Sequence, residues 1–267
     1  MQERNAPLTA RSVLASALLG EDPPELPVAH LVHLAGLFGI NENRTRVALS
    51  RMAAAGEVST DGAGCYRLAG HLLERQSRQV TSRRGATRPW RGGWRVAVVT
   101  ASGRAADDRS ARRKRLVQAR LAERREGVWL RPDNIDLEPD PADDADIELF
   151  TGQPDGDGGA LAARLWDLEG WALRAAHLVR ELEVHPPADP ADLAPGFVLS
   201  ASVLRHLQGD PLLPELLLPA GWPGPALRAS YDRWDRQYRL VLATWGRSAE
   251  PGGQRSPPRP GGGRRIV

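Results

Sequence analysis

The sequence predicts an α+β fold divided into three parts. Two observations support this prediction. Apolar residues recur with helical spacing in some segments and form short β-branched runs in others. Stretches rich in glycine and proline separate these segments. A chain of 267 residues has room for one large domain or for two to three small ones.

The first 70 residues predict three helices followed by a hairpin. Thr9 and Asn41 are N-cap residue types, and Gly20, Gly39 and Gly56 each stop a segment with helical spacing. The helices are expected at residues 10–19, 28–38 and 42–55, the proline-rich residues 20–27 as a loop, and the hairpin strands at residues 57–60 and 65–68. This order predicts a winged helix-turn-helix domain at residues 8–70.

The next part of the chain predicts a linker and a small mixed domain. Residues 71–89 are polar and predict a linker helix, and a second unit follows at residues 90–158. Its strands are expected at residues 94–100, 128–131 and 146–151, and its helix is the basic amphipathic segment 109–125. One strand, a helix and two further strands in this order predict a ferredoxin-like α+β middle domain.

Residues 159–246 predict a helical C-terminal domain. One long amphipathic helix is expected at residues 159–185, with further helices at residues 196–208 and 224–245. Residues 247–267 are rich in Gly, Pro and Arg, a composition that builds no core, so a disordered tail is expected there.

Charge is distributed unevenly along the chain, although the formal net charge is only +3. Residues 69–131 hold 17 basic and 5 acidic side chains, whereas residues 132–192 hold 3 arginines and 16 acidic side chains. A basic block of this size is typical of a phosphate-binding surface. The other interpretation is that the two blocks neutralise each other across an internal or dimer interface. The charge pattern alone leaves both interpretations open.

The third expected helix carries the clearest functional signal. Its inner face, which is expected to pack on the first two helices, holds Thr45, Ala48, Leu49 and Met52. Its outer face offers guanidinium, amide, hydroxyl and aliphatic groups, which match what the major groove of DNA presents. The expected DNA-binding residues are Asn43, Arg44, Arg46, Val47, Ser50 and Arg51 in this helix and Arg67 in the hairpin. The alternative is a solvated basic face that contacts other proteins.

Five matches in order along residues 8–246, one of them made of two segments, resemble a known family. They are ARSVLASALLG at 10–20, GINENRTRVALSRMAAAGEV at 39–58, WRGGW at 90–94 followed by GVWLRPDNI at 127–135, LWDLEGW at 165–171, and GDPLLPELLLPAGWPGPALR at 209–228. Together they resemble the PaaX family of bacterial repressors, which is named for phenylacetic acid degradation. One departure is Glu57, which stands where an apolar or aromatic residue commonly follows the glycine.

The resemblance implies both an architecture and a function. It implies a winged helix-turn-helix, a ferredoxin-like middle domain and a helical C-terminal domain. It also implies a homodimer that represses a catabolic operon by binding a roughly palindromic operator in double-stranded DNA. Release from that operator by an acyl-CoA effector, phenylacetyl-CoA in the type member, is implied as well. The effector's contact residues are unknown at this level.

An enzyme is not expected, and neither is a cofactor or a metal site. The middle domain also resembles small nuclease-like subunits of CRISPR adaptation, but no carboxylate follows its first strand directly, and Asp107 and Asp108 are expected to begin the helix. The acidic residues 133–148 lack the spacing of a calcium-binding loop and predict a solvated loop. The competing functions are an acyl-CoA-binding or hydrolysing enzyme, and an adaptor that uses the winged helix for protein contacts.

A cytoplasmic protein without a membrane span is expected. The N-terminal residues show no signal-peptide pattern, and the sequence contains no run of about 18 apolar residues. The single cysteine, Cys65, cannot form an internal disulfide, which fits a reducing compartment.

Overall fold

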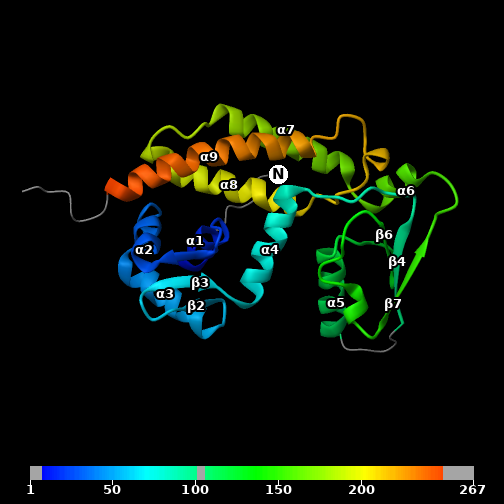
Figure 1. The fold of residues 1–267 in the computed structure, drawn as a ribbon, viewed down its shortest axis with the longest axis horizontal. Helices are drawn as coiled ribbons and strands as arrows, with labels where there is room; N and C mark the ends of the chain where they lie inside the picture. Colours follow the sequence, from blue (N-terminus) through cyan, green and yellow to red (C-terminus); the bar gives the residue numbers. More distant parts are fainter. Residues whose placement is uncertain (1–7, 101–105, 249–267) are drawn as a thin grey trace, which may run out of the picture.

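The computed structural model describes residues 8–100 and 106–248, and it confirms an α+β fold (Figure 1). The N-terminal elements are helices α1 (Ala10–Leu19), α2 (Val28–Gly36) and α3 (Glu42–Ala54), and strands β1 (Glu25–Pro27), β2 (Val58–Thr60) and β3 (Cys65–Leu68). Both predicted N-caps are confirmed. The Thr9 side chain accepts a hydrogen bond from the Ser12 N–H at 3.1 Å, and the Asn41 side chain accepts one from the Arg44 N–H at 2.9 Å.

The hairpin belongs to a three-stranded antiparallel sheet with the order β1-β3-β2. The prediction that residues 20–27 form only a loop is therefore wrong, because Glu25, Leu26 and Pro27 pair with β3. Proline is tolerated in β1 because this strand lies at an edge of the sheet, where not every backbone N–H needs a partner.

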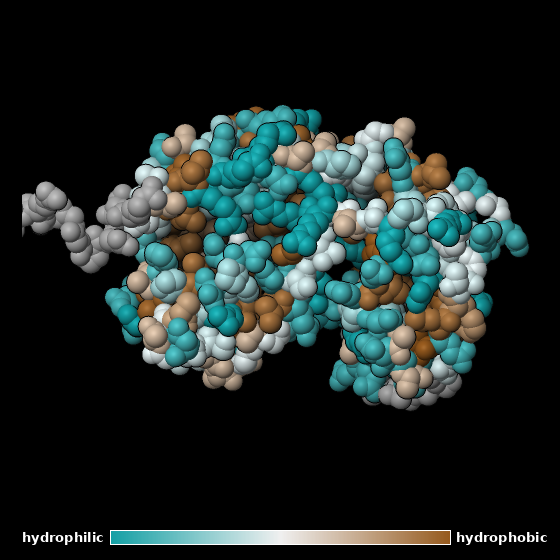
Figure 2. All heavy atoms as spheres, viewed as in Figure 1, coloured by the Kyte–Doolittle hydropathy of each residue, from teal (hydrophilic) through white to brown (hydrophobic). Residues whose placement is uncertain are grey.

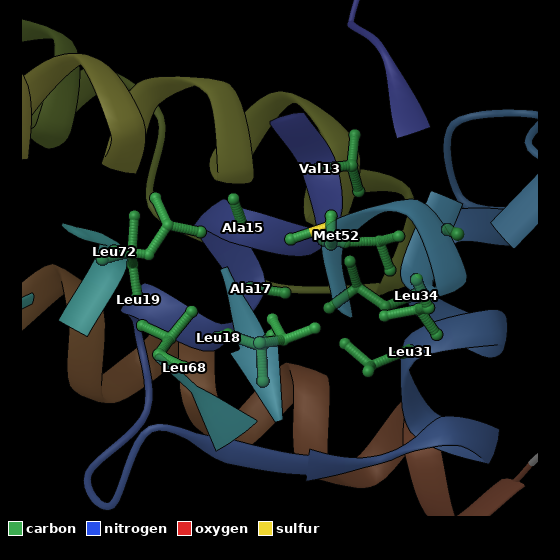
Figure 3. Close-up of a cluster of buried hydrophobic side chains, with 14 of the residues drawn as sticks. Val13, Ala15, Ala17, Leu18, Leu19, Leu31, Leu34, Met52, Leu68 and Leu72 are labelled. Atoms are coloured by element: carbon green, nitrogen blue, oxygen red, sulfur yellow. The ribbon is translucent and has the colours of Figure 1, made fainter. Parts of the chain in front are cut away.

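The N-terminal core buries the inner face predicted for α3 (Figure 3). Thr45, Leu49 and Met52 are buried, and Ala48 is partly buried. They pack with leucines of α1 and α2, including Leu18 and Leu31. Because this face of α3 is buried, its opposite face is left to solvent.

The middle part is a four-stranded antiparallel sheet beside one helix. Its elements are β4 (Trp94–Val99), α5 (Ala106–Gln118), β5 (Ala122–Arg125), β6 (Val128–Pro132) and β7 (Ile147–Gly152). The strand order is β5-β6-β4-β7, as in a ferredoxin-like sheet. Between β6 and β7, however, the structure has a single 3-10 turn, Pro141–Asp143, where a ferredoxin-like fold has its second helix.

The C-terminal part contains α6 (Gly158–Leu165), α7 (Leu168–Val184), α8 (Leu193–Gln208) and α9 (Gly224–Ser248), with 3-10 turns at Pro190–Asp192 and Glu215–Leu217. Helices α7, α8 and α9 lie side by side over the N-terminal part (Figure 1). The predicted tail begins two residues too early, since α9 includes residues 247 and 248. The remainder of that tail lies outside the described residues.

Two of the expected helices have the wrong extent. The helix expected at 109–125 ends at Gln118, because Arg120 adopts a positive φ of 62° and the chain then enters β5. The helix expected at 159–185 is two helices, since Asp167 caps α7 by accepting a hydrogen bond from the Gly170 N–H at 2.9 Å. Apolar periodicity continues across both breaks and therefore hides them.

Helix α4 (Gly70–Arg84) connects the sheet of the N-terminal part to the middle part (Figure 1). Gln79 donates a hydrogen bond to the Leu19 carbonyl at 3.3 Å, and Arg83 forms ion pairs with Asp232 at 2.8 Å and Asp235 at 2.9 Å. The linker helix thus packs on α1 and α8 and is joined to α9 by ion pairs. Within the described residues, no helix is long and apolar enough to cross a membrane.

Candidate nucleic-acid interface

The outer face of α3 is exposed along its whole length. The exposed residues are those predicted from the sequence: Asn43, Arg44, Arg46, Val47, Ser50 and Arg51. The helix N-terminus lies at the same end as Arg44, and its free N–H groups add partial positive charge there. This face therefore presents cationic, polar and aliphatic groups together.

The three arginines of this face differ in their electrostatic environment. Arg46 donates a hydrogen bond from Nε to Oε1 of Glu42 at 2.8 Å, one turn away on the same helix. Arg44 and Arg51 form no ion pair with any residue that the structure describes. Arg44 and Arg51 are consequently the side chains best prepared to meet a phosphate or a base edge.

The hairpin contributes less positive charge than expected. Arg67 is exposed on β3, but its Nε donates to Oε2 of Glu25 on β1 at 2.7 Å. At the turn, Asp61 accepts hydrogen bonds from the backbone N–H groups of Ala63 at 2.8 Å and Cys65 at 3.0 Å. These bonds lower the pKa of Asp61, so the turn carries a stabilised negative charge.

The unusual Glu57 lies buried at the base of the hairpin. It accepts hydrogen bonds from both Nε (2.8 Å) and Nη2 of Arg11 on α1, and the His71 ring lies 3.8 Å away. The pKa of Glu57 is lowered, chiefly by the hydrogen bond from Arg11. The pair ties the hairpin to α1. The sequence indicated that Glu57 is unusual, because a charged residue stands at a position that is commonly apolar. It did not indicate that Arg11 would be its partner.

Much of the basic block is neutralised inside the chain. Arg112 forms ion pairs with Asp144 at 3.0 Å and Asp146 at 2.7 Å. The same kind of pair joins Arg88 to Asp133 at 3.1 Å. The acidic residues 133–148 thus act as counter-charges of the basic segment, which supports the interpretation of internal neutralisation. Among the described residues, no cluster of three His, Cys, Asp or Glu side chains could hold a metal.

A buried polar junction joins the middle part to the C-terminal part. Arg131 is fully buried and donates to Oδ1 of Asn134 at 2.8 Å, and the Asn134 amide donates to the Leu212 carbonyl at 2.8 Å. Nearby, Arg228 pairs with the buried Asp210 at 2.8 Å. Burial lowers the pKa of Arg131 to about 9. This junction lies between segments 127–135 and 209–228. The sequence did not predict that these two segments contact each other.

Arg120 extends this junction toward the surface. Its guanidinium donates to the Gln208 carbonyl at 3.1 Å and to Oγ of Ser82 on α4 at 2.6 Å. It also donates to the Asp210 carbonyl. All three acceptors are neutral, and burial lowers the pKa of Arg120 to about 10. The nearby Asp210 carboxylate offsets part of this lowering, and Arg120 thus joins the middle part to the C-terminal part and to the linker helix α4.

Comparison with known proteins gives the family. The model of the PaaX-like protein family matches residues 9–72, which hold α1 to β3. No curated protein matches the sequence. An uncharacterized protein, Rv0674 from Mycobacterium tuberculosis, has a solved structure that is similar, with a TM-score of 0.69 and 40% identity over 89% of this chain and 98% of that chain. This chain therefore belongs to the PaaX family, a family of regulators.

Proposed function

We propose that the protein is a DNA-binding transcriptional repressor that reads double-stranded operator DNA with α3. The observation that carries this proposal is the exposed face of α3, where Arg44 and Arg51 form no ion pair with any described residue while the opposite face is buried. A major groove accepts a helix, and guanine offers two acceptors to an arginine. The hairpin, tied down through Glu57, supplies the wing beside the DNA backbone.

The proposal extends to assembly and regulation in line with the family. The protein acts in the cytoplasm as a homodimer, represses a catabolic operon and leaves the operator when an acyl-CoA such as phenylacetyl-CoA binds. Three domains divide this work: the winged helix-turn-helix at 8–70, the ferredoxin-like unit at 90–158 and the helical domain at 159–246, with 71–89 as a linker. Two-fold symmetry would match a pseudo-palindromic operator.

The test measures binding to the promoter regions beside the protein's own gene, using electrophoretic mobility shifts at several salt concentrations. Arg44→Ala and Arg51→Ala should each weaken binding by about 1–3 kcal/mol if they contact bases, because each good contact contributes that much. Arg180→Ala, which removes an exposed arginine from α7, is the matched control and should bind as the parent does.

Salt dependence separates DNA recognition from a protein-contact role. Affinity for the operator should fall steeply between about 50 and 200 mM salt, because phosphate contacts release counterions. Equal affinity of the parent and the Arg44→Ala/Arg51→Ala variant on every promoter fragment would refute the assignment of α3 as the reading helix. Absence of any DNA binding would leave the adaptor function as the better explanation.

A further inference from the structure

One side of the exposed face of α3 carries a negative charge beside a positive one. Residues four positions apart lie one turn apart on the same side of a helix, so Glu42, Arg46 and Ser50 form a row. Arg44 and Arg51 lie on the other side of the exposed face. Over the N-terminal part, which contains α3, the surface mixes hydrophilic and hydrophobic residues (Figure 2). Within α3 itself, Glu42 is the one acidic residue.

The contact between Glu42 and Arg46 occupies one edge of the guanidinium. Nε of Arg46 donates to Oε1 of Glu42 at 2.8 Å, and Nη2 lies 2.8 Å from the same oxygen. A guanidinium is planar and presents N–H groups along more than one edge. The edge formed by Nη1 and the outer N–H of Nη2 meets no acceptor in the part of the chain that the structure describes. The carboxylate therefore fixes the guanidinium plane and leaves its outer edge available.

The outer edge of Arg46 matches guanine. N7 and O6 of guanine are neighbouring acceptors in the major groove, and an arginine contacts both at once, whereas adenine presents an acceptor beside a donor. An arginine without an ion pair can turn toward any acceptor, a phosphate included. Arg46 must break its bond to Glu42 to do the same. The ion pair therefore directs this arginine toward one kind of base.

Glu42 also opposes binding to DNA of arbitrary sequence. Its side chain is 60% exposed and belongs to the first turn of α3, the end of a reading helix that contacts base edges. A carboxylate there repels phosphates and offsets a guanidinium charge that attracts them. Because specificity is a difference between affinities, weaker binding to all other sequences sharpens the preference for the correct one. An acidic residue in a first turn also suits the helix dipole, but that contribution changes no base preference.

We propose that Glu42 is a positioning residue for operator recognition, which holds Arg46 so that this arginine contacts guanine at one position of the operator. The proposal rests on the proposed function, because it requires α3 to lie in the major groove. It goes further by naming the base that Arg46 reads. It also assigns a role in specificity to a carboxylate that acts through Arg46.

Selection of binding sites from a randomised double-stranded DNA library, followed by sequencing, measures the base preference of the full chain at each position. The parent should prefer guanine at one position by about tenfold or more, as a bidentate contact provides. Arg46→Ala should abolish this preference, and Glu42→Ala should remove most of it at the same position. Arg46→Lys should also lose it, because an ammonium keeps the charge but has no second edge to be held by Glu42.

Binding to a DNA fragment that lacks the selected sequence gives a second readout. Glu42→Ala should bind this fragment more tightly than the parent does, because the repulsion between its carboxylate and the phosphates is removed. Glu74→Ala is the matched control, since Glu74 also precedes an arginine, Arg78, by four positions, but on α4. It should leave every base preference unchanged. Thermal unfolding of each variant shows whether it remains folded.

Loss of the guanine preference together with tighter binding to unselected DNA in Glu42→Ala supports the proposal. An unchanged guanine preference in Glu42→Ala or in Arg46→Lys overturns it and leaves α3 as the reading helix. Equally weakened binding of Glu42→Ala to selected and unselected DNA, with a lower melting temperature, identifies a purely structural role and also overturns it. A parent protein that selects no sequence from the library refutes the proposed function, and this proposal with it.

Discussion

Glu57 shows how one residue can set the position of a whole hairpin. It is buried, its carboxylate takes two hydrogen bonds from Arg11, and its backbone pairs with Ala69 beside the sheet. A buried carboxylate without such a partner would be strongly unfavourable. The departure from an apolar residue at this position is therefore compensated by a specific cation on α1.

Replacement of this carboxylate should have a pH-dependent effect. Glu57→Gln should lower the free energy of unfolding at pH 7 by about 1–2 kcal/mol, since hydrogen bonds to a charged group contribute on that order. The folded protein lowers the pKa of Glu57, so its contribution is present above the ordinary glutamate pKa of about 4.3 and is lost as the pH falls through the lower folded value.

Urea unfolding at a series of pH values measures this effect. The stabilities of the parent and Glu57→Gln should differ at neutral pH and converge below about pH 4. Glu74→Gln, which replaces an exposed glutamate of α4, is the control and should show a much smaller difference. A difference between the parent and Glu57→Gln that persists unchanged at pH 3 would contradict the role of the carboxylate charge.

At the scale of elements, helix α3 was predicted well from local pattern. Its N-cap, its buried face and its end within one residue were all predicted, because each depends on residues only a few positions apart. The short β1 was missed, since three residues with a proline give no periodic signal. The break between α6 and α7 was missed because the apolar pattern continues on both sides of Asp167, which caps α7.

The cap of α3 makes a prediction at this scale. Asn41→Ala should destabilise the protein by about 1 kcal/mol, because the Arg44 N–H loses its acceptor, whereas Asn41→Asp should retain most of the stability. Thermal unfolding of the three proteins measures the change. Equal melting temperatures for the parent and Asn41→Ala would show that the cap does not stabilise α3.

The contact between α8 and α9 leads to a second prediction at the scale of elements. A Cβ at Gly196 would lie 2.8 Å from the Tyr238 ring and 3.3 Å from Trp234, both of which are buried on α9. Gly196→Ala should therefore cost about 1–3 kcal/mol, as is usual for overpacking. Gly36→Ala, where a Cβ meets nothing within 4 Å, is the matched control and should be neutral or stabilising in denaturant unfolding. A neutral Gly196→Ala would contradict the close packing.

At the scale of the whole molecule, the middle part, the C-terminal part and the linker helix α4 meet through charged groups removed from water. Asp210 is buried, pairs with Arg228 and lies near Arg120, which also reaches Ser82 on α4. The junction therefore fixes α4, which follows the N-terminal part in the chain, against Arg120, which precedes β5 of the middle sheet. Arg131 and Asn134 hold the loop at Leu212 from the other side.

Removal of the Asp210 charge should disrupt this junction. Asp210→Asn leaves Arg228 and Arg120 without their buried counter-charge, so a loss of about 3–5 kcal/mol is expected in urea unfolding. Adding Arg228→Met should recover part of that loss, because it removes one of the uncompensated charges. Additive losses in the double variant would show that the two side chains act independently.

The sequence by itself determined the α+β class, the helices of the N-terminal part and the face of α3 with Arg44 and Arg51. These depend on apolar periodicity and capping, which act over a few residues. Only the tertiary structure decided which charges remain free. The partners Arg11 and Glu57 are 46 positions apart, and Arg120 and Ser82 are 38 apart. No local pattern encodes such distances, because the path of the whole chain brings these groups together.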